Sequence, residues 1–174
     1  MSVKKIVSKR TKILFSAAII LAAICALQFL LELRSPQKTF KTKELPDSIL
    51  VDNSGASLVL QKDEGGWTCS GQKLDGDKIE RLTKSLLSIK SLSVASRSDS
   101  PASLERYGLD KAILIEAKSG GKDIRQILVG KESVSGSQSY IQFKGKKEIY
   151  LVQGNFRKDW TFTLDDIKEK QENN

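Results

Sequence analysis

Residues 13–31 read ILFSAAIILAAICALQFLL, and this run decides how the chain is organised. It contains no charged residue, and its polar members are Ser16, Cys25 and Gln28. As a helix rising 1.5 Å per residue, the run would measure about 28 Å, close to the thickness of the hydrocarbon core of a bilayer. It therefore predicts an N-terminal transmembrane helix.

The leader fits two kinds of targeting segment. Basic residues followed by an apolar run are typical of a cleaved signal peptide and of an uncleaved signal anchor. The apolar core of a signal peptide has about 7–15 residues, and here residues 26–31 continue the run past a weak cleavage position at Cys25. A lipoprotein signal fits poorly because the bulky Ile24 precedes that cysteine. We expect an uncleaved anchor, with a cleaved signal as the alternative.

Most of the positive charge lies next to the apolar run. The formal net charge is +8, and residues 1–12 contain five basic residues and no acid: Lys4, Lys5, Lys9, Arg10 and Lys12. Because basic residues stay on the cytoplasmic side of a membrane, we expect a domain on the extracytoplasmic side of the cytoplasmic (inner) membrane. The part from Pro46 onward is nearly neutral, whereas nucleic-acid-binding domains concentrate basic residues on their folded part. We therefore expect no nucleic-acid partner.

Composition divides the chain into five segments. Residues 35–46, SPQKTFKTKELP, contain two prolines, several lysines and no apolar periodicity, which is typical of an extended linker. The last residues are polar, and polar chain ends tend to fray. We expect a cytoplasmic basic segment (1–12), the transmembrane helix (13–31), a linker (32–46), one extracytoplasmic domain (47–164) and a polar tail (165–174).

The first half of the domain shows the alternation of β-strands. Residues 49–51 and 58–60 alternate apolar and polar side chains around a turn at 53–55, which predicts a hairpin. Residues 67–69 fit a short third strand, antiparallel to the second, and residues 92–96 fit another short strand.

A helix is expected between these strands. Asp77 fits its N-cap, because Glu80 three residues later completes a capping-box pattern. The basic residues of the segment lie off the apolar stripe and fit a solvated surface better than a surface that grips anionic lipid. The stripe, which should pack on the hairpin, consists of Ile79, Leu82, Leu86 and Ile89.

The second half predicts a short helix and then more strands. Ser100 followed by Pro101 fits a helix start, and Gly108 fits its end. Four alternating segments follow and predict an antiparallel meander, which Phe156, Trp160, Phe162 and Leu164 would close. The predicted fold class is α+β, with antiparallel β-hairpins and a meander packed on one main helix.

The residue inventory excludes several kinds of catalysis. The chain has no histidine, which excludes Ser-His-Asp and Cys-His catalysis and histidine-bound metals. Its two cysteines are too few for a zinc site, and Cys69 fits a buried strand residue better than a reactive thiol. Nothing in the sequence brings one particular serine and lysine together for Ser-Lys catalysis.

Two sequence patterns resemble ligand sites, one for phosphate and one for a cation, but neither is convincing. Gly130-Lys131 lacks the glycine that a phosphate loop requires five residues earlier, where Arg125 stands. Helix capping accounts for Asp75 and Asp77 without a bound cation. We therefore predict no catalytic, cofactor-binding or metal-binding residues, and no cofactor.

A motif in the second half resembles a known family. The segment from Leu104 to Asp110 reads LERYGLD, a strand pair ends in LVG at 128–130, and a later strand reads IYLV at 149–152. In this order, after a hairpin with a tryptophan strand and a helix, the segments resemble the DUF4340 family over about residues 49–160. Similar domains occur in bacterial envelope proteins encoded alongside gliding-type ABC-transporter components, and the family supplies no catalytic residues.

These observations lead to an expectation about function. We expect a membrane-anchored, extracytoplasmic, non-catalytic module, a protein-interaction or auxiliary subunit of an envelope complex of the ABC-transporter type. Its expected contacts are the lipid bilayer through residues 13–31 and a protein of the envelope. The alternatives are a subunit of an enzyme that acts on envelope polymers and a purely structural tether.

Overall fold

The structure is a computed structural model that describes residues 9–33 and 37–169. The chain divides into two units, residues 1–36 and residues 37–174.

Helix α1, Lys9–Leu33, lies in the first unit. The apolar run is helical, as predicted, but the helix has 25 residues and extends past the run at both ends. Within the described ranges no helix is long and apolar enough to cross a membrane, so the predicted transmembrane helix is wrong. The prediction rested on the length and apolar composition of residues 13–31 alone.

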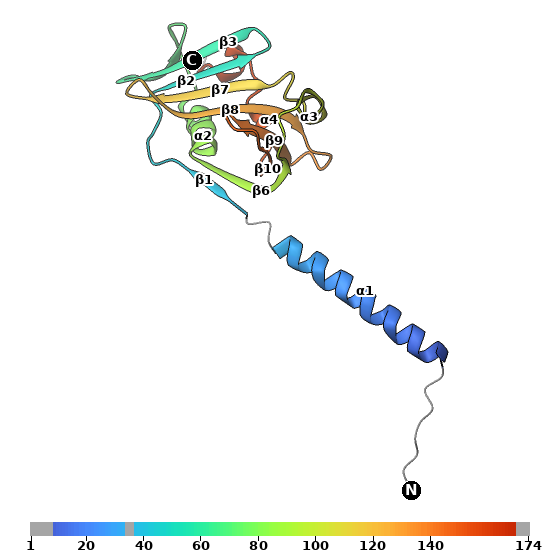
Figure 1. The fold of residues 1–174 in the computed structure, drawn as a ribbon. Coiled ribbons are helices and arrows are strands. Elements are labelled where there is room, and N and C mark those ends of the chain that lie inside the picture. Colours follow the sequence, from blue (N-terminus) through green and yellow to red (C-terminus); the bar gives the residue numbers. More distant parts are fainter. Residues whose placement is uncertain (1–8, 34–36, 170–174) are drawn as a thin grey trace. The chain divides into compact units, whose positions relative to one another are not determined.

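The second unit is built around one large antiparallel sheet (Figure 1). In the described residues the sheet has ten strands in the order β1-β6-β10-β9-β8-β7-β2-β3-β4-β5. The strands are β1 (Thr39–Lys41), β2 (Ser48–Asn53), β3 (Ala56–Asp63), β4 (Gly66–Cys69), β5 (Gln72–Lys73), β6 (Ser88–Ser96), β7 (Ile113–Ser119), β8 (Lys122–Glu132), β9 (Gln138–Phe143) and β10 (Ile149–Gln153).

The helices of this unit are small. They are α2 (Gly76–Leu87), α3 (Pro101–Tyr107), α4 (Phe156–Asp159) and α5 (Leu164–Ile167). Figure 1 shows the sheet bending around α2, whose apolar residues join the core formed by the strands. The predicted α+β class, with hairpins packed on one main helix, is therefore wrong, because the domain is mostly a continuous sheet.

One strand pairing explains most of this error. β2 pairs with β7 along its whole length, from Ser48 opposite Lys118 to Asn53 opposite Ile113. This pairing joins the N-terminal hairpin to the C-terminal meander, edge to edge. The alternation of side chains tells which face of a strand is buried, but not which other strand satisfies its backbone N–H and C=O groups.

Two further segments differ from the prediction for the same reason. β6 begins at Ser88, directly after α2, so Ile89 lies on a strand and not on the helix stripe. β1 lies inside the predicted linker and pairs with β6, with Phe40 opposite Ile89. β6 also pairs with β10, so it connects the linker segment to the meander.

Several local predictions are confirmed. The first hairpin pairs Ile49 with Leu60, and the strand that contains Trp67 runs antiparallel to β3. Helix α3 has Ser100 as its N-cap and ends at Gly108. Helix α2, however, is capped by Asp75 and not by Asp77, because the Asp75 carboxylate accepts a 3.0 Å hydrogen bond from the Lys78 backbone N–H.

The C-terminal residues complete the core. Phe156 and Trp160 of the α4 region are buried, as the sequence predicted. Packing continues past Leu164, because Ile167 of α5 is fully buried. The Asp75 backbone N–H donates to the Ile167 carbonyl, which ties this last helix to the start of α2. The structured chain therefore reaches into the segment predicted as a polar tail.

Candidate binding pocket

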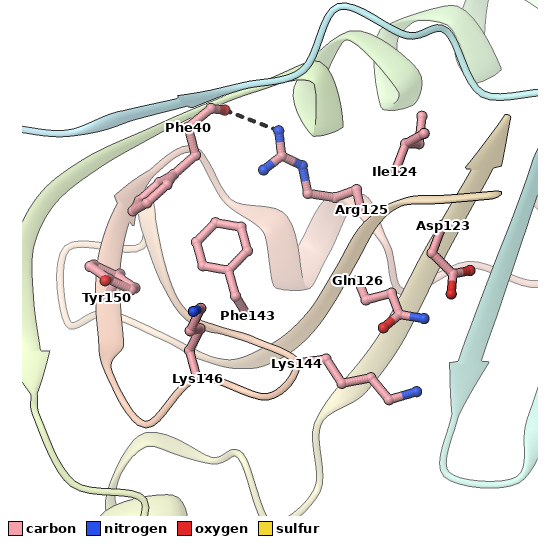
Figure 2. Close-up of a pocket in the computed structure, with 9 residues that line it drawn as sticks. All are labelled: Phe40, Asp123, Ile124, Arg125, Gln126, Phe143, Lys144, Lys146 and Tyr150. Carbon is pink, nitrogen blue, oxygen red and sulfur yellow. Dashed lines mark hydrogen bonds between the residues drawn. The ribbon is translucent and has the colours of Figure 1, made fainter.

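A pocket of about 400 Å³ opens between β1, the first part of β8 and the β9–β10 turn (Figure 2). This volume lies within the range of small-ligand sites in proteins, about 300–1,000 Å³. The pocket is lined by Phe40, Asp123, Ile124, Arg125, Gln126, Phe143, Lys144, Lys146 and Tyr150.

Arg125 is the half-buried charge of the pocket. Its Nε donates to the carbonyl of Leu86 at 3.1 Å, and its Nη2 donates to the carbonyl of Phe40 at 3.2 Å. Leu86 lies in the last turn of α2, where helix carbonyls lack intrahelical partners. Burial lowers the pKa of Arg125 from its ordinary value, although an arginine remains charged at neutral pH.

Three aromatic rings form one wall of the pocket. The Phe40 centroid lies 4.5 Å from that of Phe143 and 5.1 Å from that of Tyr150, in tilted and edge-on arrangements. The Arg125 guanidinium carbon lies 5.6 Å from the Phe143 centroid, within cation–π range. Burial, and to a smaller extent the negative charge of Glu148, raises the pKa of Tyr150, so its hydroxyl is neutral at physiological pH.

The other charges of the pocket differ in whether they are paired. Lys144 makes a 2.6 Å ion pair with Glu116, and Asp123 lies 3.8 Å from Lys118. Lys146 and Arg125 form no ion pair with any described residue. The pocket therefore carries two positive charges that no carboxylate of the described domain neutralises.

A second hollow, of about 550 Å³, lies between α2 and the α4 region. Its charges are mixed and partly internal, since the Lys78 ammonium donates to the Asp166 carbonyl at 2.6 Å. Burial raises the pKa of Asp159, and Lys158 opposes that shift. The hollow is lined by Lys78, Arg81, Leu82, Ser85, Lys158, Asp159, Thr161, Phe162 and Asp166. This mixture of charges favours no ligand of one sign.

The YGLD segment has a packing role. Gly108 ends α3 with φ +70°, a left-handed conformation that suits glycine. Leu109 is buried, and the Tyr107 hydroxyl donates to the Ala95 carbonyl at 2.9 Å. Asp110 is exposed.

The LVG segment packs directly against this motif. A Cβ atom on Gly130 would overlap the carbonyl oxygen of Tyr107, and one on Gly108 would lie 2.9 Å from the backbone nitrogen of Lys131. The YGLD and LVG segments therefore pack directly against each other, at the point where the end of α3 meets β8. Gly130 and Lys131 belong to this contact and to strand β8.

The other residues considered for chemistry have local roles. Cys69 is buried on β4, as predicted. Asp75 caps α2, and Asp77 lies in its first turn. Among the residues that the structure describes, no three acidic, cysteine or histidine side chains come together in a way that could hold a metal ion.

Comparison with known proteins identifies the family. The family model described as "Domain of unknown function (DUF4340)" matches residues 67–172. The chain belongs to the DUF4340 family. No curated protein and no solved structure matches it. The DUF4340 match begins at Trp67 of β4, extends past α5 and includes the pocket residues of β8 to β10, whereas Phe40 precedes it.

The local sequence patterns do not predict the Arg125 pocket, although the sequence carries one signal for it. Arg125, Ile127 and Val129 share one face of β8, and the latter two are fully buried. A charged residue at an inward position of an alternating strand is unusual, because a buried charge requires partners. Its partners are backbone carbonyls of α2 and β1, which no local pattern reveals.

Proposed function

We propose that this DUF4340 domain is a non-catalytic, protein-binding module that works as an auxiliary subunit of an envelope complex of the ABC-transporter type. The observation that carries the proposal is the pocket, where two unpaired positive charges lie beside three aromatic rings. Arginine and aromatic residues are enriched where proteins bind one another. The Arg125 guanidinium is held by two backbone carbonyls, an arrangement that suits recognition better than proton transfer.

The proposal is tested by photo-crosslinking in living cells. A benzophenone amino acid in place of Lys146, at the rim of the pocket, should give a crosslink to a second envelope protein that mass spectrometry identifies. The same group in place of Lys62, an exposed residue of β3, is the control and should give none. Crosslinks from both positions alike, or from neither, would contradict a binding role for the pocket.

The localisation is part of the same proposal, and it is supported by the likeness to domains of envelope proteins. We expect the domain on the extracytoplasmic side of the cytoplasmic membrane. Protease added to intact spheroplasts should then degrade the domain, while a cytoplasmic marker protein survives. Protection of the domain until the cells are lysed would place it in the cytoplasm and contradict the proposal.

A further inference from the structure

The Arg125 guanidinium, which has no carboxylate partner in the described domain, suits an acidic group of a ligand. A guanidinium has five N–H donors, and the two bonds to Leu86 and Phe40 leave three of them available. Arginine binds carboxylates through two parallel hydrogen bonds, which adds directional specificity. Lys146, on the turn after β9, adds a second positive charge at the rim. The neighbouring Lys144 is already neutralised by Glu116.

The wall beside this charge suits an apolar side chain. Phe40, Phe143 and Tyr150 come from three different strands and meet in one cluster (Figure 2). Ile124 extends the apolar lining on the side of β8. A ligand that places an acidic group on Arg125 would therefore bring its next apolar group onto the aromatic rings.

The strand that supplies Phe40 also has an edge that pairs with no other strand of the described residues. The Ser91 N–H donates to the Lys38 carbonyl, and the Thr42 N–H donates to the Leu87 carbonyl. Because backbone groups alternate in direction along an antiparallel strand, those of Thr39 and Lys41 face away from β6. β1 is the last strand of the sheet on that side, and an exposed edge strand can pair with an extended peptide.

We infer that this pocket binds an extended acidic segment of a partner protein. The segment pairs with the free edge of β1, its Asp or Glu carboxylate binds Arg125 and Lys146, and the adjacent apolar side chain packs on Phe40, Phe143 and Tyr150. The inference rests on the proposed function and names the chemistry of the partner. Charge complementarity and strand pairing together favour a peptide over other anionic ligands.

A peptide selection on the full chain tests this inference. Random heptapeptides displayed on phage are selected on the immobilised protein, and the enriched sequences are read. We expect them to share an Asp or Glu next to an aromatic or aliphatic residue. Synthetic peptides made from the enriched sequences are then titrated with wild-type protein and variants by isothermal calorimetry.

The variants separate recognition from folding. Lys146→Glu reverses an exposed charge that has no ion-pair partner in the described domain, so the fold should tolerate it. It should weaken peptide binding by about tenfold or more. Lys62→Glu, the same change on β3, should leave affinity unchanged. Arg125→Gln should abolish binding, but it also frees two carbonyls, so its thermal unfolding is measured alongside.

Several outcomes would overturn the inference. Enriched peptides without acidic residues, no enrichment at all, or equal binding by the wild type and Lys146→Glu would each do so. Binding to vesicles containing phosphatidylglycerol that depends on Lys146, without any selected peptide, would replace the peptide with an anionic lipid. If a crosslinked partner is found and Lys146→Glu still binds it normally, the proposed function stands and only the acidic-segment inference fails.

Discussion

The substitution Gly130→Ala tests the contact between the YGLD segment at the end of α3 and the LVG segment of β8. Gly130 is buried on β8, and its φ lies outside the left-handed region, so alanine meets no backbone penalty there. The added methyl group would overlap the Tyr107 carbonyl oxygen and lie 3.2 Å from Leu109 Cγ. In the folded protein the effect of this substitution is therefore one of space.

The carbonyl of Tyr107 has little freedom to move away. It lies at the end of α3, where the Leu109 N–H donates to the Leu104 carbonyl at 2.7 Å and Gly108 adopts its left-handed turn. Overpacking of this kind lowers the free energy of unfolding by about 1–3 kcal/mol. Alanine also restricts the unfolded chain more than glycine does, which raises the free energy of unfolding by up to about 1 kcal/mol. We expect a net destabilisation of roughly 1–2 kcal/mol, or a fall in Tm of about 2–8 °C.

Urea unfolding followed by tryptophan fluorescence measures this effect, since Trp67 and Trp160 are both buried. Gly76→Ala is the matched control, because its Cβ would have no neighbour within 4 Å and its φ is also ordinary. Gly76 is the first residue of α2, so that change should be neutral or stabilise by up to about 1 kcal/mol. A Gly130→Ala midpoint equal to or above that of the wild type would refute the packing argument.

Three further substitutions probe single polar groups. Thr83→Val should raise the free energy of unfolding by about 1 kcal/mol in urea titrations, because the buried Thr83 hydroxyl has no hydrogen-bond partner in the described structure. Tyr107→Phe should lower it by roughly 0.5–1.5 kcal/mol in the same assay, because the bond to the Ala95 carbonyl is lost. Hydrogen bonds from Thr163 lower the pKa of Asp166 below its ordinary value of 3.8. The ionised Asp166 carboxylate therefore stabilises the folded protein fully above pH 3.8, and this stabilisation is lost as the pH falls through the folded pKa. Thermal melts should therefore show Asp166→Asn less stable than the wild type at pH 6, with the difference shrinking below pH 3.8; a difference independent of pH would contradict the assignment.

Local chemistry made much of the domain predictable. Turn residues at 53–55 and the alternation around them predict the first hairpin correctly. Ser100, Pro101 and Gly108 predict the bounds of α3, because caps depend on the backbone of a few neighbouring residues. The YGLD, LVG and IYLV segments, in their order after the hairpin and helix, indicate the family that the family model confirms.

Local rules fail where two neighbouring residues fit the same role, or where one residue fits two kinds of secondary structure. Asp75 and Asp77 both fit an N-cap, and the hydrogen bond to the Lys78 N–H decides for Asp75. Ile89 continues the helical spacing, yet it pairs with Phe40 in the sheet. The predicted transmembrane helix rested on one apolar run, and none of the helices in the described ranges is long and apolar enough to cross a membrane.

The sequence by itself determined the type and place of most strands, the caps of α3 and the family of the domain, because these depend on neighbours along the chain. Only the tertiary structure decided that β2 joins β7, that the linker contributes β1, and that Arg125 reaches carbonyls of α2 and β1. Strands far apart in the sequence pair through backbone groups that every residue carries, so local side-chain patterns did not indicate these partners. The pocket arises from those choices, since Phe40, Arg125 and Tyr150 meet only when the sheet has formed.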